Sequence, residues 1–336
     1  MDSFVFHGKQ QDWPDVARGI CIISIILGHL GIAEINRIVY LYHIPVFFLI
    51  AGYSLKKTEE KQFIRKEANR LLVPYAVTSM VICFLALIKV LISNGSIKGA
   101  LLPWIGAALY GAGDDWQKPF VIKGIGAIWF LWALFFGLII VNHFVERSYY
   151  QAVIAVIAFF GWMSFDRTGI WLPLSVQSGM LTSLYILIGY ECRKRKRSVN
   201  DISIPIFPLM LLIMLFGIWN FHGFWLVHNY FGNGWFDFFM SLAASGVVLK
   251  LSQILCKTGW LKKILVFFGQ NSMLVLCAHL IELKMLPFRD LINIIAGDSI
   301  SKPVLALLLL IAVKLIYVVA VVKCFKLVTN YCLPAS

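Results

Sequence analysis

Residues 15–32 read DVARGICIISIILGHLGI, an apolar stretch with an arginine near its start and a histidine near its end. A bilayer core roughly 30 Å thick is crossed by about 20 apolar residues in a helix. Further stretches of this kind occupy residues 38–55, 71–93, 125–145, 151–165, 176–191, 202–221, 234–255, 264–286 and 303–329. The sequence therefore predicts an all-α integral membrane protein, a bundle of about ten transmembrane helices.

The composition excludes several other classes of protein. The 336 residues are 60% hydrophobic and 14% charged, whereas soluble proteins carry roughly 25% charged residues. This excludes a disordered chain, a coiled coil and a soluble globular enzyme. The net charge of +13 would suggest a nucleic-acid partner in a soluble protein. In a membrane protein it instead indicates which loops face the cytoplasm, and we expect no nucleic-acid partner.

The basic residues orient the predicted bundle. If the N-terminus lies in the cytoplasm, the basic loops 56–70, 192–200 and 256–263 also lie there, with 18 lysines and arginines inside against 7 outside. This imbalance predicts cytoplasmic N- and C-termini. None of the seven cysteines falls in a predicted outer loop, so no disulfide framework is expected. We expect a single transmembrane domain over residues 1–336, with no appended soluble domain, in a bacterial plasma membrane.

The first predicted span carries the densest set of ionisable residues. Such groups cost about 2.5–3.5 kcal/mol within a membrane and therefore indicate functional sites. Arg18 and His29 are eleven residues apart, which is about three turns and roughly 16 Å along one helix face. Asp15 is spaced to pair with Arg18. The alternatives are a snorkelling arginine that only anchors the helix and a core histidine bonded to another helix.

The second span contains His43 and Pro45. The proline frees backbone groups that must be satisfied inside the protein. His43 is expected at a depth close to that of His29, so the two histidines predict a polar pocket. The alternative for His43 is an ordinary interfacial position.

A basic cluster and an aromatic cluster flank the next spans. Arg65, Lys66 and Arg70 precede the third span, where they would anchor it to the cytoplasmic side or bind the phosphates of a cytoplasmic ligand. Trp129 and Trp132 open the fourth span. They are candidates for the aromatic belt of the interface or for a platform on which a sugar stacks.

The ninth span carries a polar face. Ser272 and His279 are seven residues apart and share a side of the helix, while His279 and Glu282 are neighbours at i, i+3. Asn271 and Ser272 are also typical of residues that hold helices together, and Glu282 could simply be solvated. No metal-binding, P-loop, nucleophile-elbow or dinucleotide motif is found in the sequence, so no metal cofactor is expected.

Six sequence elements, in order along the chain, resemble the membrane-bound acyltransferase family 3, most of all its fucose 4-O-acetylase-like branch. These elements are Trp13-x-Asp15-x-x-Arg18-Gly19-Ile20, the spacing of Arg18 and His29, His43-x-Pro45-x-Phe47-Phe48 with Gly52, the basic motif Arg65-Lys66 with Arg70, Trp129-Phe130-Leu131, and Gly269-x-Asn271-Ser272 with His279. Ala51 stands where the family usually has serine, so no role for that hydroxyl is carried over.

The resemblance implies transfer of an acyl group, usually acetyl, from cytoplasmic acetyl-CoA to a hydroxyl of a surface glycan or its lipid-linked precursor. Arg65, Lys66 and Arg70 would hold the CoA phosphates, with Arg18 along the entry path. A histidine with its ordinary pKa of about 6.5 suits a general base at neutral pH, and His29 is the candidate.

Three details of this mechanism stay open. His29 could act directly or through an acetyl-histidine intermediate. Asn271 or Ser272 is the candidate to stabilise the oxyanion. The remaining candidates would line the acceptor end: His43, Trp129, His279 and Glu282.

The rival hypothesis is a transporter or flippase of a lipid-linked sugar or an acyl group, with no chemistry. Inverted repeats and broken helices are typical of transporters. The sequence shows no such repeat, although Pro45 in the short second span would suit a broken helix.

Overall fold

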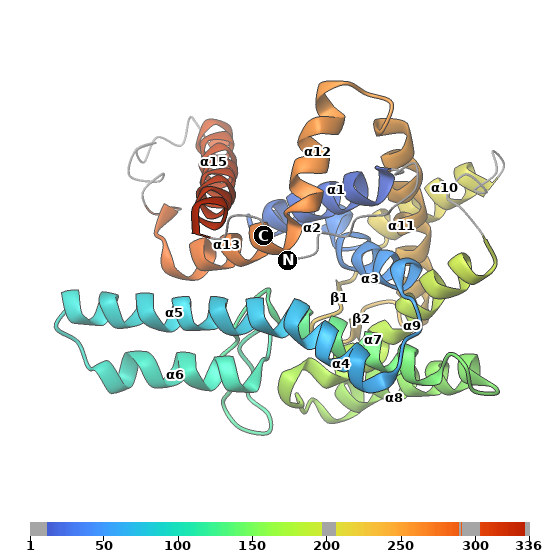
Figure 1. The fold of residues 1–336 in the computed structure, drawn as a ribbon, viewed down its shortest axis with the longest axis horizontal. Helices are drawn as coiled ribbons and strands as arrows, with labels where there is room; N and C mark the ends of the chain where they lie inside the picture. The colour runs from blue at the N-terminus through green and yellow to red at the C-terminus, as the bar shows by residue number, and fades with distance from the viewer. Residues whose placement is uncertain (1–11, 197–205, 289, 291–302, 333–336) are drawn as a thin grey trace.

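The computed structural model describes residues 12–196, 206–288, 290 and 303–332, and these are nearly all helical (Figure 1). The first part of the chain forms α1 (Trp13–Gly28), α2 (Ala33–Val39), α3 (His43–Ser54), α4 (Glu60–Glu67), the π-helix η1 (Ala68–Leu72), α5 (Val73–Ile92), α6 (Ile97–Tyr110) and α7 (Trp129–Phe144). The second part forms α8 (Tyr150–Thr168), the 3₁₀ turn η2 (Pro173–Ser175), α9 (Val176–Lys194), α10 (Ile206–Trp219), α11 (Trp235–Leu255), α12 (Trp260–Gln270), α13 (Ser272–Met285) and α15 (Pro303–Cys332). Two short antiparallel strands, β1 (Phe224–Trp225) and β2 (Tyr230–Phe231), form a hairpin.

Every predicted span contains a helix, but not every helix is long enough to cross a bilayer. Among the described residues, four helical segments have the length and apolarity for a crossing: Ala33–Ser54, Glu60–Ile92, Trp235–Leu255 and Val304–Thr329. The helices α6, α7 and α10 are apolar but shorter. The structure therefore supports a nearly all-α protein with several apolar helices, while the number of ten crossings and the cytoplasmic termini stay predictions. Residues 197–200 of one basic loop lie outside the described residues.

The ninth predicted span is broken. Instead of one helix over 264–286, α12 and α13 meet at Asn271 with a bend of 75°. The side-chain amide of Asn271 donates a hydrogen bond to the carbonyl oxygen of Phe267 at 2.6 Å. An asparagine that bonds to nearby backbone in this way competes with the regular helical pattern. The hydropathy of the sequence alone does not predict this bend.

Helix α1 lies at the centre of the bundle, in contact with α3, α11, α12 and α13. Its crossing with α12 depends on glycine. A Cβ atom on Gly19 would lie 2.0 Å from the carbonyl oxygen of Leu265, and one on Gly269 would lie 1.8 Å from that of Asp15. Only glycine allows two helix backbones to approach this closely. These contacts fix the start of α1 against α12.

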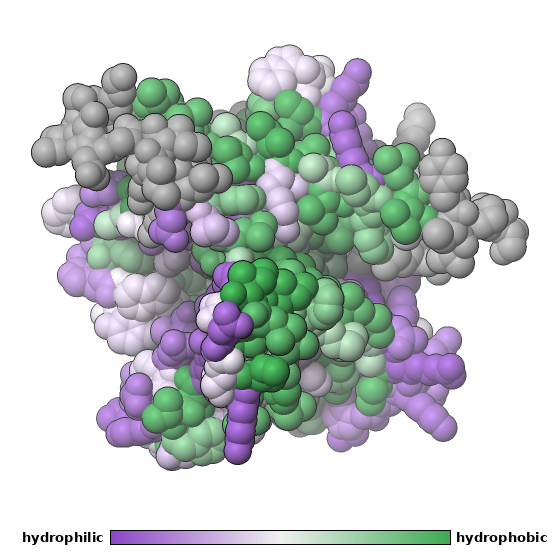
Figure 2. All heavy atoms as spheres, turned by 90° about the vertical axis from the view of Figure 1, so that its left-hand side faces the viewer, coloured by the Kyte–Doolittle hydropathy of each residue, from purple (hydrophilic) through white to green (hydrophobic). Residues whose placement is uncertain are grey.

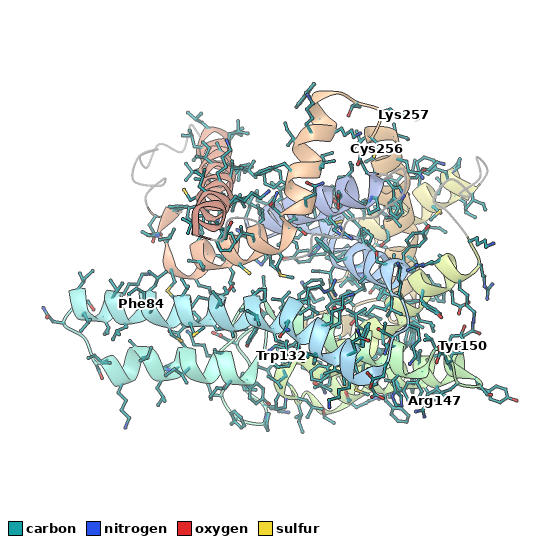
Figure 3. All side chains as sticks on the ribbon, in the orientation of Figure 1. Phe84, Trp132, Arg147, Tyr150, Cys256 and Lys257 are labelled. Carbon is teal, nitrogen blue, oxygen red and sulfur yellow. The ribbon has the colours of Figure 1, made fainter. Side chains whose placement is uncertain are left out.

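Helices α5 and α6 form a hairpin that extends to the left in Figure 1. Its outer side exposes large apolar side chains, with Met80 62% and Phe84 61% exposed. Figure 2 shows hydrophobic surface near the centre of this side of the molecule, with hydrophilic side chains around it. Figure 3 places Phe84 toward one end and Arg147 and Tyr150 at the opposite end. Extensive exposed apolar surface of this kind fits a protein whose surroundings are lipid.

Candidate functional site

A cavity of about 280 Å³ lies at the end of α1, and His29 is part of its wall. The wall is completed by residues before and within α3, by the loop that follows α6, by the start of α7, by the β-hairpin and by α13. Three of the predicted site residues meet here: His29, His43 and Trp129. The predicted proximity of the two histidines therefore corresponds to one shared cavity.

His29 has a defined orientation because it follows directly after α1. Its Nδ1 atom lies 2.7 Å from the carbonyl oxygen of Ile25. A carbonyl can only accept, so Nδ1 carries the proton and donates it. A neutral ring then has Nε2 as its acceptor. His43 is held in the same manner, with Nδ1 2.6 Å from the carbonyl oxygen of Val39.

A chain of buried polar groups contacts His29. The Nε2 atom of His279 lies 3.4 Å from Nδ1 of His29. Nδ1 of His279 lies 3.0 Å from Oε2 of Glu282, and Lys314 donates to the other oxygen of that carboxylate. His279, Glu282 and Lys314 are 0%, 2% and 5% exposed. The predicted acceptor-contacting residues His279 and Glu282 thus lie behind His29, where they can orient its ring.

A second acidic group, Asp114, faces the cavity from the loop after α6. Its Oδ2 atom lies 2.9 Å from Nε2 of His228, and its side chain is 56% exposed. Burial acts to raise the pKa of Asp114, but the contact with His228 and the positive charges of His228 and Lys284 outweigh this and lower the pKa. The carboxylate is therefore ionised at neutral pH.

An aromatic cage fixes the position of His228. Its ring centroid lies 5.1 Å from that of Trp171, 5.5 Å from that of Trp116 and 6.0 Å from that of Phe165. Packing among large rings restricts the movement of a side chain in a loop. Asp114 thus meets a fixed partner at the cavity wall.

The start of α1 forms a separate charged region. Arg18 donates to Asp15 at 2.8 Å, and the side-chain amide of Gln270 donates to the other oxygen of Asp15 at 3.3 Å. Arg70 pairs with Glu67, which is 5% exposed. Each of the two predicted arginines is therefore held by a carboxylate three residues earlier in the chain.

The other predicted residues take different positions. Arg65 and Lys66 are exposed on α4, on the same short segment as Arg70. Asn271 and Ser272 lie at the bend between α12 and α13. Seven residues separate Ser272 from His279 along α13, which is roughly 10 Å. The structure does not bring Asn271 or Ser272 to His29.

Sequence reasoning missed several groups around the cavity. Lys284 and Lys314 were visible as charges within apolar stretches, which is a recognised indication of function. Tyr40, Asp114 and His228 occur outside the long helices, at no diagnostic spacing. Within the ranges that the structure describes, no group of three histidine, cysteine, aspartate or glutamate residues could hold a metal ion.

Comparison with known proteins gives one match. A family model described as an acyltransferase domain, of the acyltransferase 3 type, matches residues 11–322. No curated protein and no solved structure matches the chain. The matched residues include both ends of α1, the Arg70 segment, the cavity wall and the buried chain behind His29. Because the match covers nearly the whole chain, this protein belongs to the acyltransferase 3 family, whose members are membrane acyltransferases.

Proposed function

We propose that the protein transfers an acetyl group from cytoplasmic acetyl-CoA to a hydroxyl of a cell-surface glycan or its lipid-linked precursor. The resemblance to the fucose 4-O-acetylase-like branch supports a sugar acceptor. The observation that carries the proposal is the orientation of the His29 ring. Its Nδ1 atom is engaged by Ile25, and its ring faces a cavity with polar and aromatic walls.

His29 acts as the general base in this proposal. Nε2 takes the proton of the acceptor hydroxyl as that oxygen attacks the thioester carbonyl. The carbon–sulfur bond then breaks, and the proton passes from the imidazolium to the departing CoA sulfur. His279 and Glu282 are positioning residues in this proposal: His279 contacts the ring of His29, and Glu282 holds His279.

Arg18 and Arg70 form the donor end. Both guanidinium groups suit the recognition of CoA phosphates, and Arg65 and Lys66 add positive charge on the exposed side of α4. Arg18 and His29 are separated by roughly 16 Å along α1, which is comparable with the reach of an extended pantetheine arm. Asn271 and Ser272 follow Gly269, which packs against Asp15 at the start of α1, and in this proposal they contribute to donor binding.

The cavity around His29 forms the acceptor end. Its volume of about 280 Å³ suits one sugar ring. The aromatic side chain of Trp129 offers a stacking surface, and His43 and the carboxylate of Asp114 can bond to sugar hydroxyls. A mainly apolar wall with a few convergent polar groups is typical of small-ligand sites.

One observation favours the second candidate, a transporter or flippase. The 75° break between α12 and α13 resembles the discontinuous helices that bind substrates in transporters. A transporter would move a lipid-linked sugar without consuming acetyl-CoA.

The test uses purified protein in nanodiscs and liposomes with acetyl-labelled acetyl-CoA and glycans extracted from the host. The proposal predicts CoA release that depends on the glycan and label that appears on a sugar hydroxyl. Movement of the sugar across liposomes without CoA release would establish the transporter instead. Deletion of the gene, followed by mass spectrometry of surface polysaccharides, would then identify the acceptor.

A further inference from the structure

A second cavity adjoins the one around His29. It has a volume of about 530 Å³ and lies between α5, α6 and the end of α13. Three lysines contribute to its wall: Lys89 from α5, Lys123 from the loop before α7 and Lys284 from α13. Lys284 also lines the His29 cavity. The two cavities therefore meet at this side chain.

The three lysines leave this second cavity strongly positive. No aspartate or glutamate contributes to its wall, and within the described ranges none of the nine ion pairs involves Lys89, Lys123 or Lys284. Asp114, which lines the adjoining His29 cavity, is an acidic group that interacts with Lys284. Like charges that converge on one cavity repel one another, and an anion between them removes that cost.

The position of Lys123 is defined by an aromatic ring. Its Nζ atom lies 4.3 Å from the centroid of the Trp104 ring, a distance typical of a cation–π contact. The indole ring of Trp104 belongs to the same cavity wall. This contact holds the ammonium group at the cavity without neutralising its charge.

The remaining wall is mostly apolar and continues onto an apolar surface. Ala86 and Val90 of α5 face Ala100 and Pro103 of α6 across the cavity. Beyond it, the same two helices expose apolar side chains, among them Leu102 at 57%, and Figure 2 shows hydrophobic surface over this side of the molecule. An anion attached to a hydrocarbon chain matches both features.

We propose that the lysine-lined cavity binds the phosphate group of a lipid-linked sugar, with the lipid chain along the α5–α6 hairpin and the sugar in the His29 cavity. The position of the sugar rests on the proposed function, whereas the phosphate site does not. Lys284 lies at the junction, where the phosphate joins the sugar. The acceptor is therefore a lipid-linked precursor rather than a finished polysaccharide.

The experiment measures the binding of farnesyl diphosphate to the protein in phosphatidylcholine nanodiscs, with no acyl donor present. Farnesol, which has the same chain but no phosphate, and inorganic pyrophosphate, which has no chain, are compared with it. We expect farnesyl diphosphate to bind at least tenfold more tightly than either. Loss of one charge-assisted contact should weaken it by about tenfold in Lys284→Gln or Lys123→Gln.

Two controls separate the site from general effects of charge. Lys98→Gln removes an exposed lysine of α6 that does not line the cavity, and should leave binding unchanged. Lys284→Arg keeps the charge and should retain most of the affinity. Circular dichroism and size-exclusion chromatography confirm that each variant is folded.

Three results would overturn the proposal: equal affinity for farnesol and farnesyl diphosphate, equal weakening by Lys98→Gln, or pyrophosphate as tight as farnesyl diphosphate. Loss of farnesyl diphosphate binding on replacing half of the lipid with phosphatidylglycerol would assign the site to a phospholipid headgroup instead. The His29→Ala variant should bind farnesyl diphosphate normally, so failure of acyl transfer and failure of the phosphate site are distinguished.

Discussion

The two ends of α1 use charge in different ways. At the Arg18 end, each arginine has its own carboxylate, Asp15 for Arg18 and Glu67 for Arg70. At the His29 end, one buried carboxylate, Glu282, is shared by His279 and Lys314. Separate ion pairs hold cations in place, whereas a buried shared chain fixes where a proton sits. This difference supports the proposal of donor binding at one end of α1 and proton transfer at the other.

The largest effect is expected from Gly269→Ala, because both ends of α1 depend on its packing against α12. In Gly269→Ala, the new methyl group would meet the carbonyl oxygen of Asp15 at 1.8 Å. Separation of α1 from α12 should cost about 1–3 kcal/mol of stability and reduce both donor binding and turnover. Thermal unfolding in detergent measures the first effect, and CoA release the second.

The matched control for that substitution is Gly259→Ala, at the start of the same helix. No atom lies within 4 Å of a Cβ atom placed there, so stability should change by less than about 0.5 kcal/mol. Equal stability of the two variants would contradict the close crossing of α1 and α12.

Arg18→Ala should act on the donor end alone. Removal of a charged contact to the donor should raise the KM for acetyl-CoA by about 10–100-fold, without lowering the amount of folded protein in the membrane. Arg65→Ala removes an exposed charge and should raise the KM only a few-fold. Steady-state kinetics with varied acetyl-CoA distinguishes them, and a larger effect of Arg65→Ala would move the donor site away from α1.

Glu282→Gln should act on the catalytic end alone. Loss of the charge that orients His279 should lower kcat by about 10–100-fold while the KM for acetyl-CoA stays within about twofold of the wild-type value. Because the substitution leaves Lys314 buried without its partner, Glu282→Gln/Lys314→Met provides a variant with both charges removed. An unchanged kcat in a folded variant would exclude the positioning role.

Asp114→Asn should have the smallest effect. Its side chain is 56% exposed, so solvent screens its interactions, and we expect the KM for the acceptor to rise by up to about tenfold while that for acetyl-CoA stays constant. The folded-state pKa of Asp114 is lowered. Its stabilising contribution is therefore present at neutral pH and disappears as pH falls below about 4.

Thermal unfolding of wild type and Asp114→Asn from pH 7 to pH 3 checks this direction. The difference between the two proteins should shrink toward the acidic end of the series. A difference that grows as the pH falls would show that the carboxylate is not stabilised by His228 and Lys284.

Sequence and structure agree best on the positions of the helices, because long apolar stretches determine them. Hydropathy located a helix in each predicted span, and the motifs around Arg18 and His29 correctly indicated the acyltransferase 3 family. The break at Asn271 escaped prediction because it depends on one side-chain bond to Phe267. Single local bonds of this kind leave no trace in a hydropathy pattern.

The candidate site was predictable only in part. His29 and His43 were expected near each other because both were placed at similar depth, and the structure puts them in one cavity. Asp114 and His228 come from separate loops, and His228 packs against Trp116 and Trp171. Contacts between loops depend on the tertiary fold, so residue spacing along the chain does not indicate them.

The most direct test of the account is the turnover of His29→Ala. Purified wild type and variant receive acetyl-labelled acetyl-CoA and the glycan acceptor, and the acetylated product is measured along with the affinity for acetyl-CoA. Loss of a general base should lower acetyl transfer by about 10²–10⁴-fold, while donor affinity, which the proposal assigns to Arg18 and Arg70, changes by less than about twofold. Normal acetyl transfer by the folded variant would contradict the assignment of His29 as the base.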